Sequence, residues 1–76
     1  NRTFRLHIDN LIEYNLKIFN RWGTLMFETN DIEEAWDCTY EGKNVEQGVY
    51  VWKAVYRHND SPNREQVESG NFMIYN

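Results

Sequence analysis

Residues 48–57 read GVYVWKAVYR, and this stretch decides the fold class. In a strand, side chains point alternately to opposite faces of the sheet, so every second residue shares a face. One face of this stretch carries Tyr50, Trp52, Ala54 and Tyr56. The other carries three valines and a lysine, so both faces are partly apolar. We therefore expect a strand over residues 49–57 that lies in the middle of a sheet.

The same alternation recurs on both sides of this stretch. Working outward, it predicts further strands over residues 4–8, 15–19, 24–28 and 66–75. Turn-forming residues separate them, among them Asn10, Gly23 and Pro62, and a hairpin is expected around Gly42. About six or seven short antiparallel strands at such spacings predict an all-β, Ig-like β-sandwich. Gly70, inside the last range, is a candidate β-bulge.

A short acidic stretch, residues 31–35, is the one place where a helical turn is expected. Asp31 is expected to cap it, with Glu33 and Glu34 in the first turn, where negative charge is favoured. A calcium loop is the alternative, but the spacing departs from that of an EF-hand, which needs ligands at alternate positions and a central glycine. The stretch is therefore interpreted as a solvated, capped acidic loop.

Size and composition exclude several classes of function. A chain of 76 residues is expected to form one domain, residues 1–76, with no second lobe to enclose a catalytic cleft. The net charge is -4 and the basic residues are scattered, which argues against nucleic-acid binding. The single Cys38 allows no internal disulfide, and no apolar run approaches the roughly 20 residues of a membrane helix. Because Asn1 is not a start methionine, we expect a segment cut from a longer chain.

No pattern of reactive side chains points to catalysis or to a cofactor. His7, His58 and Cys38 lack the closely spaced ligand pairs that zinc sites use. The four glycines are far apart, so no phosphate-binding loop is predicted, and no G-x-S-x-G elbow occurs. We expect no enzymatic activity, no metal, no cofactor and no small-molecule substrate.

The three tryptophans leave one alternative open. Trp22, Trp36 and Trp52 could form a flat platform for sugar rings, as in a carbohydrate-binding module. The competing interpretation is that they fill a small core and cover its ends. Trp52 lies in the middle of a strand and is expected in the core. Trp22 and Trp36 lie beside turns, and both are expected to be partly exposed.

Residues 16–23 read LKIFNRWG, and this run is more specific than a general strand pattern. LMFE follows at residues 25–28, then Trp36-Asp37, and then Gly48, Tyr50 and Trp52 at alternate positions. This series resembles the type B C-terminal sorting domain of the type IX secretion system, also called the gliding-motility-associated C-terminal domain. The resemblance covers nearly the whole chain. Its signature residues correspond to Asn20, Arg21, Trp22, Gly23, Trp36, Asp37, Gly48, Tyr50 and Trp52.

Two positions depart from the family pattern. Cys38 stands where a glycine usually follows Trp-Asp, so the turn there is expected to differ. The sequence ends on Asn76, where the family often has an apolar residue and a basic one.

The signature residues are expected to specify the fold, and direct contact with the secretion machinery is the alternative. Gly23 would provide a turn that a side chain would hinder, and Asn20 would bond the backbone at a strand end. Arg21 would either stack on Trp22 or pair with a carboxylate such as Asp37.

The resemblance implies a recognition module of Bacteroidota rather than an enzyme. Such a domain would be recognised in the periplasm and would direct an attached cargo across the outer membrane to the cell surface or the medium. Its partners would be outer-membrane and periplasmic proteins of the type IX translocon, and in isolation it would be monomeric. The last strand, and within it Phe72, Met73, Ile74 and Tyr75, is the candidate docking edge. A carbohydrate-binding module or a passive Ig-like spacer of an adhesin remains the alternative.

Overall fold

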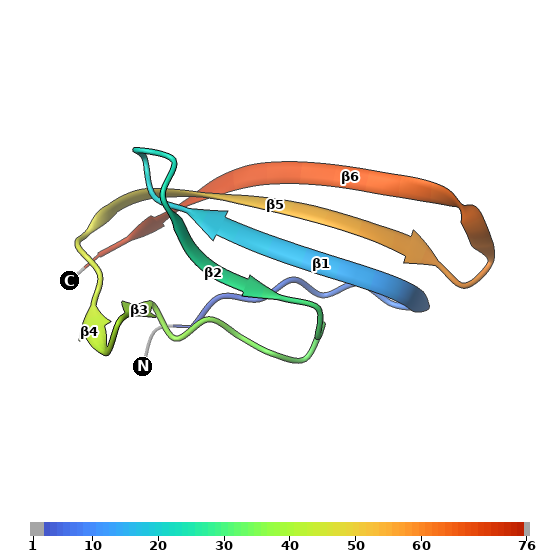
Figure 1. Ribbon diagram of the computed structural model, residues 1–76, viewed down its shortest axis with the longest axis horizontal. Coiled ribbons are helices and arrows are strands. Elements are labelled where there is room, and N and C mark those ends of the chain that lie inside the picture. Colours follow the sequence, from blue (N-terminus) through green and yellow to red (C-terminus); the bar gives the residue numbers. More distant parts are fainter. Residues whose placement is uncertain (1–2, 76) are drawn as a thin grey trace.

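The computed structural model describes residues 3–75, and Asn76 lies outside this range. The described part is all-β (Figure 1), as the sequence predicts, and contains no helix. It therefore has no helix that is long and apolar enough to cross a membrane. The six strands are β1 (Leu11–Phe19), β2 (Leu25–Thr29), β3 (Thr39–Tyr40), β4 (Lys43–Asn44), β5 (Gly48–His58) and β6 (Ser61–Ile74).

Four of these strands form an antiparallel sheet in the order β2-β1-β5-β6. The predicted central position of β5 is confirmed, because β1 and β6 flank it. Strands β3 and β4 form a separate two-stranded ribbon, which provides the predicted hairpin around Gly42. The ribbon and the N-terminal segment lie on the same side of the sheet (Figure 1), so the architecture is a small, uneven sandwich.

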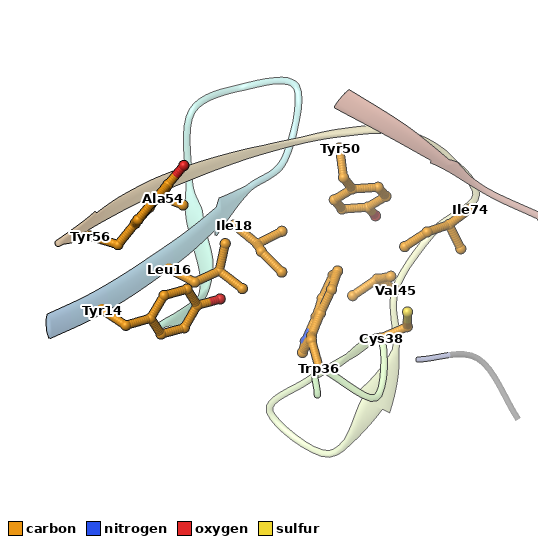
Figure 2. Close-up of a cluster of buried hydrophobic side chains, with 10 residues drawn as sticks. All are labelled: Tyr14, Leu16, Ile18, Trp36, Cys38, Val45, Tyr50, Ala54, Tyr56 and Ile74. Carbon is orange, nitrogen blue, oxygen red and sulfur yellow. The ribbon is translucent and has the colours of Figure 1, made fainter. Parts of the chain in front are cut away.

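The core lies between the sheet and these covering segments. Trp36 is its largest fully buried side chain, at 1% exposure, and its Nε1 donates to the Thr39 carbonyl at 2.9 Å. Of the two partly apolar faces expected for β5, the one that carries Tyr50, Ala54 and Tyr56 is buried. Ten residues make up the core, as Figure 2 shows: Tyr14, Leu16, Ile18, Trp36, Cys38, Val45, Tyr50, Ala54, Tyr56 and Ile74.

The strand predicted over residues 4–8 is reduced to a single antiparallel bridge. Phe4 N donates to Trp36 O at 2.9 Å, and Trp36 N donates to Phe4 O at 2.8 Å. Phe4, Leu6 and Ile8 nevertheless pack against the core. Alternation in a sequence reports which side chains are buried, and here the facing segment turns away before a ladder can extend.

Residues 31–35 form one hydrogen-bonded turn rather than a helical element. Glu34 N donates to Asp31 O at 3.0 Å, and Glu33 N donates to Asp31 Oδ1 at 2.9 Å. The predicted capping role of Asp31 is therefore present. The turn is tied to the end of β2 because the buried Thr29 hydroxyl donates to Glu34 and accepts from Asp31 N. This turn directs the chain back under the sheet and brings Trp36 into the core.

The predicted bulge at Gly70 is wrong. Gly70 pairs with Trp52 in regular register, and the register shift between β5 and β6 lies at Tyr56 and His58, near the hairpin. A Cβ on Gly70 would lie 2.8 Å from Trp52 Nε1, closer than nonbonded atoms approach. Glycine is therefore needed at this position because the Trp52 indole lies across β6, and not because the strand bulges.

Candidate recognition surface

The signature residues Asn20 to Gly23 form the turn between β1 and β2. Asn20 N donates to Thr24 O, and Gly23 N donates to Asn20 O, both at 3.0 Å. The Asn20 side-chain oxygen accepts from the backbone N–H groups of Trp22 and Thr24, both at 2.9 Å. Gly23 has a φ of +86°, in the region that only glycine adopts without cost. Asn20 and Gly23 thus fix a rigid three-residue hairpin loop.

Arg21 and Trp22 lie at the tip of this loop and point into solvent. The Trp22 side chain is 78% exposed. The Arg21 guanidinium carbon lies 5.0 Å from the centroid of the Trp22 ring, which is a cation–π arrangement. Of the two arrangements expected for Arg21, the structure contains the stack on Trp22. Asp37 instead caps a turn, since its Oδ1 accepts from Thr39 N at 3.1 Å and from Thr39 Oγ1 at 2.6 Å.

An open recess of about 380 Å³ lies beside the hairpin tip. Asn20, Arg21 and Trp22 line one part of it, and Gly48 and Tyr50 line another. The recess therefore joins two signature segments that are far apart in the sequence. Its remaining lining comes from Met26, Tyr40, the stretch from Lys43 to Gln47, and Val49.

The sequence could not reveal that β3 and β4 contribute to the recess. The separate ribbon contributes Tyr40 and Lys43 to the lining of the recess, although neither residue belongs to a motif. A two-residue strand carries too little alternation to be placed from sequence. The expected hairpin around Gly42 was the only available signal.

The tryptophans do not form a common platform. Trp36, expected to be partly exposed, is buried, with its ring centroid 5.7 Å from that of Tyr50 and 6.3 Å from that of Phe27. Trp52 is half-buried on the inner face and packs against the core cluster, in line with its prediction. Only Trp22 of the three is largely exposed, so these rings present no flat surface for a sugar chain.

Cys38 adopts a backbone conformation that glycine usually supplies. Its φ is +64°, and its side chain is buried at 3% exposure. Its carbonyl accepts from Val45 N at 3.1 Å, which ties residue 38 to the chain after β4. The chain therefore places a side chain in the left-handed region at residue 38, a conformation that glycine adopts at lower cost.

The candidate docking segment lies on an edge of the sheet, because β6 has a neighbour only on the β5 side. Along it, Phe72 is half-buried and Ile74 is buried, and both face the core. Met73 and Tyr75 are 48% and 69% exposed. Outward-facing side chains therefore occur at this end of an edge strand.

The described residues hold no group of three or more metal-ligating side chains. Among the tyrosines, burial raises the pKa of Tyr14 above its usual value, an effect that Arg5 partly opposes. Burial also raises the pKa of Tyr56, and Glu68 adds to this. Both phenols are therefore neutral near pH 7. The geometry defines a small β-sandwich whose distinctive feature is the exposed Arg21–Trp22 tip.

The chain matches the family model described as the CHU_C type IX secretion signal domain over residues 1–75. It therefore belongs to this family of type IX secretion signals, and its role is that of a sorting signal for export to the cell surface or the medium. No curated protein and no solved structure matches the chain.

Proposed function

We propose that this domain acts as a folded docking signal that the type IX machinery reads mainly at the Arg21–Trp22 tip. The domain would stand at the C-terminal end of an exported protein and guide its cargo from the periplasm through the outer membrane. It would act as a single module without enzymatic activity. The observation that carries the proposal is the exposure of Trp22, 78% in a loop that Asn20 and Gly23 hold rigid.

Exposure of this kind has no function in folding. A tryptophan that contributes to a core buries most of its surface, as Trp36 does. Trp22 is instead 78% exposed and lies against the Arg21 guanidinium. Tryptophan and arginine are the residue types most enriched at the centres of protein interfaces. A protein partner would bury both side chains at little ordering cost, because the loop is already fixed.

The recess beside the tip offers a second element of the same surface. A partner side chain that entered it would contact Trp22 on one wall and Tyr40 on the other. Such a pocket next to an exposed aromatic residue is typical of an interface anchor site. Two further signature residues, Trp36 and Asp37, support this surface from inside by holding the turn under the sheet.

The β6 edge is a second candidate contact, through addition of a partner strand alongside Phe72 to Tyr75. Prolines at those positions whose N–H groups point away from β5 would remove edge donors without breaking the ladder. If such variants fold and are exported normally, strand addition at this edge is ruled out.

A transfer experiment tests the proposed function. Residues 1–76, with their native upstream stretch, are fused behind a signal peptide and a fluorescent protein in a bacterium that has a type IX system. The proposal predicts fluorescence at the surface or in the medium, and its loss when the translocon is deleted. Periplasmic retention of a folded fusion in the intact strain would contradict it.

A further inference from the structure

On the outer face of the sheet, which is the face opposite the core, side chains of different kinds lie in separate rows. Each row crosses the strands and consists of residues that the strand register makes direct partners. The row nearest the Arg21–Trp22 tip contains Leu25, Phe19, Val51 and Asn71, and Val49 and Met73 lie beyond it. The next row contains Glu28, Lys17, Lys53 and Ser69. The following row contains Asn15, Val55 and Val67.

The row of Lys17 and Lys53 is not balanced in charge. The two lysines are direct cross-strand partners, and like charges in this relation destabilise a sheet. In the part of the chain that the structure describes, no carboxylate lies within ion-pair distance of either ammonium group. Glu28, next to Lys17 in the row, accepts a hydrogen bond from the Asn15 side chain at 2.9 Å.

At the far end of the same face, by contrast, a cation is paired with carboxylates. Arg57 lies between two carboxylates there, with its Nε 3.8 Å from Glu13 Oε2 and its Nη2 3.9 Å from Glu65 Oε2. The lysine pair has no equivalent arrangement, although its residues lie on the two inner strands of the sheet. On this face, the uncompensated charge lies at the Lys17–Lys53 row.

Apolar side chains adjoin this row on the side of the hairpin tip. Leu25 is 40% exposed, Val51 38%, Val49 42% and Met73 48%, with the half-buried Phe19 among them. Val49 also lines the recess, so this surface continues into the proposed recognition site. Adjacent exposed apolar residues in register across strands mark an interaction surface.

We propose that this outer face binds an acidic segment of a partner protein of the secretion machinery. At least one carboxylate of that segment lies over Lys17 and Lys53, and its apolar side chains cover Phe19, Val51 and Met73. Charge complementarity selects this occupant, because a second copy packed face to face would bring its own lysine pair against the first. The inference rests on the proposed function and names the chemistry of the partner.

The discriminating variant is Lys53→Glu. It places a carboxylate on each side of Lys17 in the row, because Glu28 already lies on the other side, and so reproduces the balanced arrangement around Arg57. We expect the melting temperature to stay the same or to rise, on the order of 4 °C. Export of the fluorescent fusion is expected to fall about tenfold, because the partner's carboxylate now meets a carboxylate. A misfolded variant could not combine these two results.

The matched control is Arg64→Glu, the same change in charge at an exposed residue near the other end of β6. It should be exported like the wild type. Lys53→Thr introduces a neutral residue that is suited to a strand. It is the second variant, for use if Lys53→Glu does not fold, and it should also lower export.

Normal export of folded Lys53→Glu, or equal loss with Arg64→Glu, overturns this inference while wild-type export still upholds the proposed function. If the wild type is not exported, the proposed function fails and this inference fails with it. Sedimentation of the isolated chain identifies other occupants. A dimer that Lys53→Glu disrupts would assign the face to a second copy, and binding to phosphatidylglycerol vesicles would assign it to lipid; either result overturns the proposal.

Discussion

Gly70 and Trp52 are direct partners on β6 and β5, and the Trp52 indole occupies the space that a side chain on residue 70 would need. The ring edge lies 2.8 to 2.9 Å from an ideal Cβ at this position. With β6 open at this point, Trp52 can lie flat against the inner face and reach Phe4, whose ring centroid is 6.4 Å away. Phe4 in turn stacks on Phe72 at 4.2 Å. The absence of a side chain at Gly70 thus leaves room for Trp52. The rings of Trp52 and Phe72 contact Phe4, and these contacts hold the N-terminal segment against the sheet.

Gly70→Ala is therefore expected to destabilise the domain by about 1–3 kcal/mol, because the indole must shift and carries Phe4 with it. Urea unfolding followed by tryptophan fluorescence measures the loss. Ser69→Ala, at the neighbouring exposed position, is the control and should change stability by less than about 0.5 kcal/mol. Equal effects of the two substitutions would contradict the close contact between Gly70 and Trp52.

Trp22→Ala and Trp36→Ala should have very different effects on stability. The exposed Trp22 contributes little to folding, so its loss is expected to cost less than about 0.5 kcal/mol. Loss of the fully buried Trp36 side chain is expected to lower the free energy of unfolding by about 3–5 kcal/mol, which is enough to unfold so small a domain. Thermal unfolding by circular dichroism compares the two. A large loss of stability in Trp22→Ala would mean that the tip has a structural function.

At position 38, glycine should give a more stable protein than alanine, which is the reverse of the order usual in β-strands. Both substitutions remove the buried thiol, but only glycine adopts a φ of +64° without steric cost. We expect Cys38→Gly to be more stable than Cys38→Ala by about 1 kcal/mol. Urea titration of both variants measures the difference, and a more stable Cys38→Ala would contradict the assigned backbone conformation.

Alkaline pH should destabilise the fold. Burial raises the pKa of Tyr14 and Tyr56 above the value that these phenols have in the unfolded chain. The unfolded state therefore loses protons first as the pH rises, and stability falls above about pH 10 while it is constant below. The urea midpoint as a function of pH measures this fall. Tyr14→Phe should weaken it, because it removes one of the two phenols with a raised pKa.

Strand alternation predicted the sheet because it follows directly from burial. The central place of β5 in the sheet agrees with the sequence-based expectation. The same pattern over residues 4–8 correctly indicated which side chains are buried, but it did not show that the backbone there pairs only once, with Trp36. The order of residue types in the sequence indicates which side chains are buried, whereas strand pairing depends on where a distant segment turns.

The candidate surface was predictable only in part. The backbone contacts of Asn20 and the stack of Arg21 on Trp22 are local, so their short spacing revealed them. The burial of Trp36 depends on the turn at residues 31–34, which a nearby turn signal alone does not orient. The lysine row and its apolar neighbours required the register between four strands, since these residues come from segments that are far apart in the sequence.

Export of the fluorescent fusion carrying Trp22→Ala tests the central claim most directly. The same fusion with Trp22→Phe is the matched control, because it retains an aromatic ring for Arg21 to cover. If the machinery reads the exposed tip, folded Trp22→Ala accumulates in the periplasm, while Trp22→Phe is exported at a substantial fraction of the wild-type level. Wild-type export of Trp22→Ala, with its fold confirmed by circular dichroism, would contradict the claim that the Arg21–Trp22 tip is the recognition site.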